Sequence, residues 1–210
     1  MKLFNSTERW SKWWKNRKID WKEHYLNPDH PHRTLIAEVL KHMRWGCLIE
    51  IGCGAGANLM AILKSMPNPQ VQVGGVDINK DAIELANKNF KGGLFKVGTG
   101  EDVMLSDDAT DIVLTDMYMI YLTPKRIAKQ LKEIARITRN SVVFCELHSE
   151  NRLERLAIKW REGYNVYDYK KLLDKHGFYD IKLYKLPPEF WPESKLQQKY
   201  CYIITAKVPY

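Results

Sequence analysis

The sequence contains no long hydrophobic run and no leader-like beginning. None of its apolar stretches approaches the roughly 20 residues that a membrane-spanning helix needs, so we expect no transmembrane segment. Residues 1–20 are too rich in charge and tryptophan to resemble a signal peptide. These absences lead us to expect a soluble, cytoplasmic protein.

Cysteines are few and irregularly spaced. The four of them, Cys47, Cys53, Cys145 and Cys201, form neither a CxxC pair nor a Cys/His spacing typical of metal ligands. Three of the four fall within runs that we predict to be buried strands. We therefore expect thiols packed in the core, with no disulfide framework and no metal site.

Repeats, low-complexity tracts and a convincing interdomain linker are also absent from the sequence. A chain of 210 residues, 45% of them hydrophobic, is long enough for one well-packed α/β domain. The formal net charge of +8 would suit an anionic partner such as RNA, a nucleotide sugar or a membrane surface. Net charge does not report the fold, so the pattern along the chain has to supply it.

Short β-branched runs alternate with helical periods over most of the chain. The predicted helices cover 31–44, 57–66, 81–90, 124–138 and 169–176, and the predicted strands cover 47–51, 71–76, 94–97, 111–115 and 141–147. Two last strands, 179–186 and 200–208, are separated only by a Pro-rich loop without a helical segment, so they should pair antiparallel. The predicted fold class is α/β: a seven-stranded, mostly parallel sheet with helices on both faces, a C-terminal antiparallel β-hairpin and an N-terminal helical cap.

The strongest local signal is the segment LIEIGCGAGANL at residues 48–59. An apolar strand runs directly into three alternate glycines, Gly52, Gly54 and Gly56, and then into a helix. Such a loop lets the backbone approach a ligand closely and leaves free N–H groups at the helix start. The next strand ends in Asp77, about twenty residues further on, where an acid can accept hydrogen bonds from the two ribose hydroxyls of an adenosine-containing cofactor.

NAD is a competing cofactor, because Gly52, Gly54 and Ala57 also fit the dinucleotide pattern G-x-G-x-x-A. Glu50 argues against it, since a carboxylate two residues before Gly52 would repel a pyrophosphate but can orient a cationic, amino-bearing cofactor. The chain also lacks room for a second mononucleotide-binding half. A purely structural glycine turn followed by a surface aspartate is the third interpretation.

The region from Leu48 to about Leu147 resembles the core of class I (Rossmann-like) S-adenosylmethionine-dependent methyltransferases. Four motifs carry the resemblance in order: LIEIGCGAGANL, GGVDINKDAIELA, VGTGEDV and ATDIVLTDMYMIYLTP. The predicted terminal hairpin resembles that family as well. The resemblance implies that S-adenosyl-L-methionine is the cofactor and S-adenosyl-L-homocysteine the product.

The resemblance also implies which residues hold the cofactor. The three alternate glycines would line its methionine and ribose parts, Glu50 would support the glycine loop and the amino group, and Asp77 would hold the ribose hydroxyls. The remaining predicted cofactor-binding residues would surround the adenine, the transferable methyl group and the methionine end: Ile78, Gly100, Glu101, Asp102, Asp116, Met117, Asn58 and Arg33. Relatives usually carry aspartate where Thr99 stands, so adenine recognition would pass to Glu101, Asp102 or backbone groups.

The segment after the fourth predicted strand bears on the acceptor. TDMYM, residues 115–119, lacks the NPPY or DPPY sequence of adenine amino-methylases, and no Pro-Cys pair is present for attack on cytosine C5. An oxygen, carboxylate or amine nucleophile on a smaller acceptor is therefore predicted. The candidates around the mouth of the site are His148, Tyr118, Tyr121 and the HPHR run at residues 30–33. His148, Tyr118 and Tyr121 are the candidate catalytic residues, because open α/β sheets bind ligands at the carboxyl ends of their strands. A catalytic base is optional, because alignment and a dry site supply most of what methyl transfer needs.

The beginning of the chain is unusually rich in tryptophan. Trp10, Trp13, Trp14 and Trp21 lie among lysines and arginines and would share roughly one face of a helix. We predict a helical cap or lid at residues 1–46 and a methyltransferase domain at residues 47–210. The open alternatives for the Trp-rich segment are a helix packed on the core, a basic aromatic surface for RNA and an interfacial membrane helix.

The sequence thus predicts an enzyme, an S-adenosylmethionine-dependent methyltransferase that acts on a small-molecule acceptor, acidic or sugar-like in view of the basic charge. One alternative is a tRNA or rRNA methyltransferase that docks through its Trp-rich N terminus. The other is a non-catalytic, cofactor-binding interaction protein.

Overall fold

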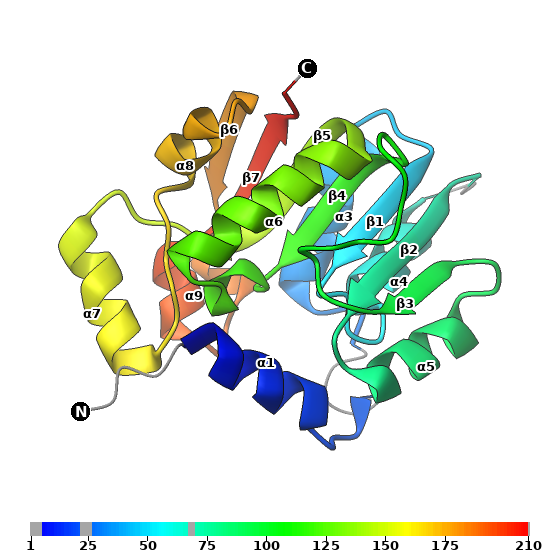
Figure 1. Cartoon of the computed structure of the whole chain (residues 1–210), viewed down its shortest axis with the longest axis horizontal. Coiled ribbons are helices and arrows are strands. Elements are labelled where there is room, and N and C mark those ends of the chain that lie inside the picture. Colours follow the sequence, from blue (N-terminus) through cyan, green and yellow to red (C-terminus); the bar gives the residue numbers. More distant parts are fainter. Residues whose placement is uncertain (1–5, 22–26, 67–69, 210) are drawn as a thin grey trace.

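A single mixed sheet forms the centre of the computed structural model, which describes residues 6–21, 27–66 and 70–209 (Figure 1). Its strand order is β3-β2-β1-β4-β5-β7-β6. The first five strands in this order, from β3 to β5, pair in parallel. The strand β7 lies between β5 and β6 and pairs antiparallel with both. The predicted sheet and its terminal antiparallel hairpin are confirmed. The strands are β1 (Cys47–Ile51), β2 (Gln72–Asp77), β3 (Leu94–Val97), β4 (Thr110–Asp116), β5 (Thr138–Leu147), β6 (Tyr179–Lys185) and β7 (Cys201–Lys207).

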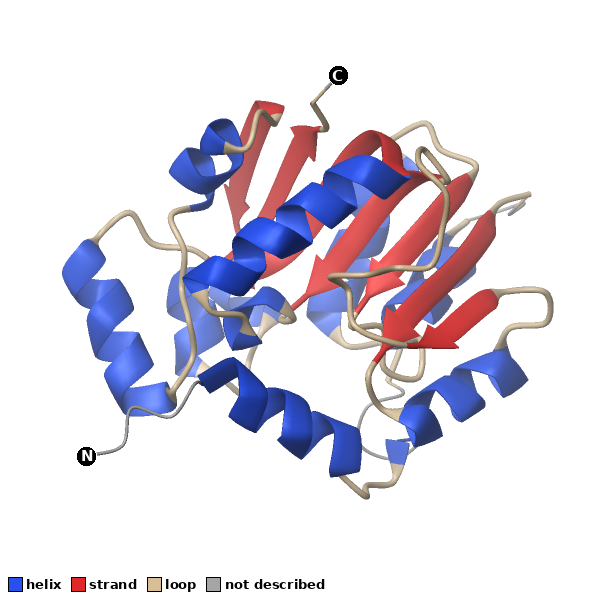
Figure 2. Ribbon diagram, in the orientation of Figure 1, coloured by secondary structure: helices blue, strands red, loops and turns tan. Residues whose placement is uncertain are grey.

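Helices cover both faces of this sheet, as Figure 2 shows. One face packs against α3 (Pro31–Lys41), α4 (Ala57–Ser65) and α5 (Lys80–Asn89). The other packs against α6 (Pro124–Ile137) and α8 (Tyr169–Lys175). Because both faces are covered, the central strands are buried along most of their length and are largely apolar rather than alternating.

The helix α3 belongs to the main core although it lies within the predicted N-terminal cap. Its Ile36 and Leu40 are completely buried and pack in the same cluster as Leu48 of β1 and Leu59 of α4. Pro31 occupies the first turn, where its missing N–H costs no hydrogen bond. Within the described residues, the part of the cap that lies outside this core therefore includes α1 (Ser6–Asn16).

The sequence interpretation missed two helices, α7 (Arg152–Glu162) and α9 (Lys195–Tyr200). The prediction that the last two strands are separated by a loop without a helical segment was wrong, since η2 (Pro188–Phe190) and α9 both lie there. The helices η2 and α9 are too short to produce a clear helical period in the sequence. In α7 the buried residue is Ile158, so this helix shows no apolar stripe toward the core.

None of the helices in the described part of the chain has the length and apolar character needed to cross a membrane.

Candidate functional site

A cavity of about 360 Å³ opens at the carboxyl ends of β1, β2 and β4. Its wall consists of the glycine loop after β1, the end of β2, residues 98–100 after β3, residues 116–118 and 121–122 after β4, and parts of α1 and α3. This is the place where open α/β sheets bind ligands, because neighbouring loops diverge there as the strand order reverses between β1 and β4.

The glycine loop follows β1 in a conformation that side chains do not tolerate. Gly52 has a φ of +78°, and a Cβ added to it would lie 2.7 Å from Cδ2 of Tyr118. Gly56 has a φ of +88°, and its Cβ would lie 2.5 Å from Cε2 of Phe90. Glycine is therefore required at both positions for the backbone to turn and for the two aromatic rings to pack against it.

Asp77 lies at the end of β2 and fixes the loop from the other side. Its Oδ2 accepts a hydrogen bond from the Gly54 N–H at 2.9 Å, and its Oδ1 accepts one from the Asn79 N–H at 2.8 Å. Burial raises the pKa of this carboxyl, although the backbone donors partly offset the effect. Asp77 and the neighbouring Ile78 both line the cavity, so the carboxylate can still accept hydrogen bonds from a ligand there.

A cluster of buried polar side chains lies beside the glycine loop. Asn58, in the first turn of α4, donates through Nδ2 to Glu50 Oε1 at 2.6 Å and to Asp116 Oδ2 at 3.0 Å. His32 Nε2 lies 2.9 Å from the same Asp116 oxygen. A neutral imidazole is sufficient for this contact, because it can donate one N–H to the carboxylate, and burial lowers the pKa of His32.

The two acids of this cluster ionise differently. Burial raises the pKa of Glu50 to about 8. Burial also opposes ionisation of Asp116, but His32, Arg33 and Asn58 together outweigh it and lower the pKa of Asp116 to about 2. At neutral pH this cluster therefore holds one carboxylate, Asp116, and one protonated carboxyl group, Glu50.

Four buried polar atoms in this cluster have no hydrogen-bond partner among the residues that the structure describes: Glu50 Oε2, Asn58 Oδ1, Asp116 Oδ1 and Arg33 Nε. All four residues line the cavity. Leaving a buried polar group unpaired costs about 1–3 kcal/mol, so such a set is rare without a role. Its composition, several acceptors together with a guanidinium donor, is complementary to a ligand end that carries both an ammonium and a carboxylate group.

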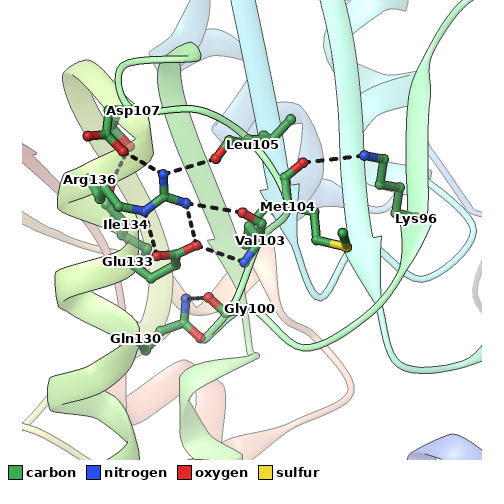
Figure 3. A network of polar contacts seen from close by, with 11 residues as sticks. Lys96, Gly100, Val103, Met104, Leu105, Asp107, Gln130, Glu133, Ile134 and Arg136 are labelled. Atoms are coloured by element: carbon green, nitrogen blue, oxygen red, sulfur yellow. Dashed lines mark hydrogen bonds and ion pairs between the residues drawn. The ribbon is translucent and has the colours of Figure 1, made fainter.

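The loop after β3 forms a rigid part of the wall because α6 holds it in place (Figure 3). Gln130 Nε2 donates to the Gly100 carbonyl at 2.6 Å. Arg136 donates to the carbonyls of Leu105 at 2.9 Å and Val103 at 3.2 Å, and also pairs with Glu133. Gly98, Thr99 and Gly100 consequently present a fixed backbone surface to the cavity.

The opposite wall is aromatic and comes largely from the Trp-rich segment. Trp10, Trp14 and Trp21 line the cavity, and Trp10 packs on Tyr121 with 5.2 Å between ring centroids. Asn79 holds the segment against α5, since its Nδ2 donates to the Trp14 carbonyl at 2.7 Å. The prediction that the four tryptophans share a face was wrong for Trp13, which points outward beneath Arg17, with 3.9 Å between the guanidinium and the ring centroid.

Comparison with known proteins supports the same interpretation. Residues 48–141 match the family model described as a methyltransferase domain. No curated protein matches the chain. The resemblance to a methyltransferase domain is thus confirmed over this region, which is just under half of the chain.

Solved structures share the fold at low sequence identity. Geranyl diphosphate C-methyltransferase from Streptomyces coelicolor A3(2), in complex with Mg²⁺, geranyl diphosphate and S-adenosyl-L-homocysteine, is 12% identical with a TM-score of 0.68, covering 99% of each chain. A Haloferax volcanii chain from the complex with the Trm112 methyltransferase activator is 16% identical with a TM-score of 0.66, covering 100% of each chain. The CurJ carbon methyltransferase is also 16% identical, with a TM-score of 0.64 over 85% of this chain, which spans about half, 54%, of that one.

Most of the predicted cofactor-binding residues meet in the cavity. Those that line it are Arg33, Glu50, Gly52, Gly54, Asn58, Asp77, Ile78, Gly100, Asp116 and Met117. Gly56, Glu101 and Asp102 are not among its lining residues in the described part of the chain. Glu101 instead pairs with Arg126, and Asp102 is exposed, so the cavity wall near Thr99 is mainly backbone.

The predicted catalytic residues separate in the structure. Tyr118 and Tyr121 line the cavity. Tyr118 donates its hydroxyl proton to Gln130 Oε1 at 2.9 Å, and burial raises its pKa. The structure does not bring His148 into the cavity: this side chain is buried, packs against Tyr202 and accepts the Tyr169 N–H through Nδ1 at 3.1 Å.

Trp191, Glu193 and Glu146 escaped the sequence interpretation, whereas His30 and His32 belong to the HPHR run that the sequence places at the mouth of the site. His30 connects His32 to Glu193, with 2.5 Å between the two Nδ1 atoms and 2.6 Å from His30 Nε2 to Glu193 Oε1. Trp191 stacks on His32 at 4.0 Å. Both partners come from the Pro-rich segment before β7, whose sequence gives no sign of proximity to the glycine loop. A signal did exist for Glu146, an acid within the apolar strand β5, which accepts from the N–H groups of residues 118 and 119.

Proposed function

We propose that this chain transfers the methyl group of S-adenosyl-L-methionine to an oxygen, carboxylate or amine nucleophile of a small-molecule acceptor. The main support for this proposal is the set of four buried polar atoms beside the glycine loop that lack a hydrogen-bond partner among the described residues. Glu50 and Asp116 can accept hydrogen bonds from the ammonium of the methionine end, and Arg33 can donate to its carboxylate. Asp77 can accept from the ribose hydroxyls.

The cofactor would supply a methyl group attached to a positively charged sulfur. The protein supplies position and surroundings. The ionised Asp116 favours positive charge in its part of the cavity. Trp10, Trp14 and Tyr121 close the other side, exclude water and hold the acceptor in line. Alignment of this kind supplies about 7–11 kcal/mol of a barrier.

A small acceptor is favoured over RNA by the orientation of the Trp-rich segment. Trp10, Trp14 and Trp21 line the cavity and pack on Tyr121, Ala55 and Ala82. Indole rings used in this way present little stacking surface to bases from outside. We therefore propose that α1 forms a lid over the acceptor, with Tyr121 as the predicted catalytic residue that contacts it.

An untargeted transfer assay tests the proposal. The protein is incubated with methyl-labelled cofactor and cell extract, and label is then counted in small-molecule, RNA and protein fractions. We expect label in the small-molecule fraction, and background levels with the control variant Asp77→Ala. Label in RNA would contradict the small acceptor, and equal counts for both variants would contradict methyl transfer by this site.

A further inference from the structure

Helix α7 exposes three large apolar side chains along one side. Leu153, Leu156 and Trp160 are 74%, 53% and 83% exposed. Their spacing of three and then four residues places them side by side on the helix surface. Ile158, the buried residue of α7, lies on the other side of the helix. In Figure 1, α7 lies at the margin of the molecule, away from the sheet.

This helix is held in place without the help of its apolar stripe. The Asn151 side chain caps its start by accepting from the N–H groups of Leu153 and Glu154. Gly163 ends it in the left-handed conformation and donates its N–H to the Lys159 carbonyl at 3.0 Å. Arg155 donates to the Ser149 and Glu150 carbonyls at 2.8 Å each. The stripe is thus presented to solvent in a fixed orientation.

Cations border the stripe on both sides. By helical spacing, Arg152 and Lys159 lie along one border and Arg161 along the other, and all three are exposed. The acids of α7 lie further round the helix. Glu154 is engaged by Lys199 at 3.4 Å and by Ser149. An apolar face of Leu and Trp flanked by Lys and Arg is typical of helices that lie in a membrane interface.

We propose that α7 docks this protein on an anionic lipid surface, with Leu153, Leu156 and Trp160 entering the interface and the bordering cations contacting headgroup phosphates. A second copy of the chain fits less well, because symmetric pairing of two such helices would bring their cations together. A stable protein interface buries roughly 800 Å² of surface on each partner. Three side chains on one convex helix bury far less than this. The net charge of +8 acts in the same direction.

Docking at α7 would bring the lipid surface next to the lid of the cavity. Trp10 of α1 donates through Nε1 to the Gly163 carbonyl, just after α7, at 3.4 Å, and packs on Tyr164 with 5.6 Å between ring centroids. The membrane-facing role that the sequence left open for the Trp-rich segment is thus assigned to another helix. The proposal stands without methyl transfer, because it rests on the surface of α7 alone.

Vesicle co-sedimentation tests the proposal. We expect the wild type to sediment with vesicles of phosphatidylcholine and phosphatidylglycerol, to release as salt is raised, and to bind vesicles of phosphatidylcholine alone much more weakly. Trp160→Ser should weaken binding about tenfold or more, because the indole no longer leaves water. Lys159→Glu should weaken binding to the anionic vesicles. Met104→Ser is the matched control, since Met104 is 79% exposed but lies in the loop after β3.

Circular dichroism and S-adenosyl-L-homocysteine binding should be unchanged in these variants, since each altered side chain is exposed. The proposal is overturned if the wild type stays in the supernatant, if it prefers neutral vesicles, or if Met104→Ser loses as much binding as Trp160→Ser. Sedimentation velocity separates the rival occupant: self-association that Trp160→Ser abolishes would assign the stripe to a second copy and overturn lipid docking.

Discussion

Glu50 has a carboxyl group that is buried in the wall of the cavity, and its unpaired Oε2 can accept a hydrogen bond from a ligand. Burial raises its pKa to about 8, so it carries a proton at neutral pH when no cation lies beside it. A cation placed beside it would favour the ionised form and lower that pKa. Binding of an ammonium-bearing ligand is therefore coupled to release of a proton from Glu50.

This coupling predicts the pH dependence of cofactor affinity. Affinity for S-adenosyl-L-homocysteine should rise as pH increases toward about 8, by up to about tenfold per pH unit, and the Glu50 contribution should level off above it. Glu50→Gln keeps an oxygen for the Asn58 contact but cannot ionise, so the rise should disappear. Isothermal titration calorimetry at several pH values measures the affinity of the wild type and of Glu50→Gln. The same slope in the two proteins would show that Glu50 does not contact the ligand's cation.

Among single residues, the ones that the sequence predicted best are those whose type is determined by the local backbone conformation. The alternate glycines and Asp77 belong to one continuous strand-loop-strand pattern, and all but Gly56 of these line the cavity. Contacts between distant segments gave no such signal. The His32 contacts with Asp116 and Trp191 join residues 84 and 159 positions apart, and no local period encodes them.

Among the elements, those that bury an apolar stripe were the predictable ones. α6 buries Ile127, Leu131 and Ile134 at helical spacing, and it was expected to within one residue. α7 was missed although Leu153, Leu156 and Trp160 follow a helical spacing. In α1 the tryptophans Trp10 and Trp14 turn toward the cavity whereas Trp13 turns away, a difference that composition alone cannot specify.

If α1 is a lid, its removal should reduce the rate of methyl transfer much more than the affinity for the cofactor. Removing residues 1–21 should leave the sheet folded, because every strand and crossover helix lies beyond them. Methyl transfer should fall much more than S-adenosyl-L-homocysteine affinity, since the glycine loop and Asp77 remain while the water-excluding wall is lost. Label transfer and calorimetry on the same preparation measure the two effects.

Trp13→Ala is the matched control for this deletion, because it removes an outward-facing tryptophan from the same helix. Its transfer rate should match that of the wild type. A truncated protein that unfolds would show that the segment is part of the core, and one that stays folded with full transfer would contradict the lid.

On the scale of the whole molecule, the strand order determines where the chemistry is placed. The strand order reverses between β1 and β4, so the loops at their carboxyl ends diverge, and α3, α1 and the segment before β7 line the cavity that lies between these loops. The alternation of strands and helices in the sequence is sufficient to predict the sheet, its terminal hairpin and the edge that holds the site. The closing wall required long-range packing to be seen, because it is assembled from segments at opposite ends of the chain.

The central claim is that this cavity binds a sulfonium nucleoside rather than a dinucleotide, and calorimetry tests it most directly. The wild type should bind S-adenosyl-L-methionine and S-adenosyl-L-homocysteine and show little or no heat with NAD, because the ionised Asp116 attracts an ammonium group and repels a pyrophosphate. Asp77→Ala should weaken that binding by about an order of magnitude or more through the loss of charged hydrogen bonds to the ribose. Preferential binding of NAD, or unchanged affinity in Asp77→Ala, would contradict the account.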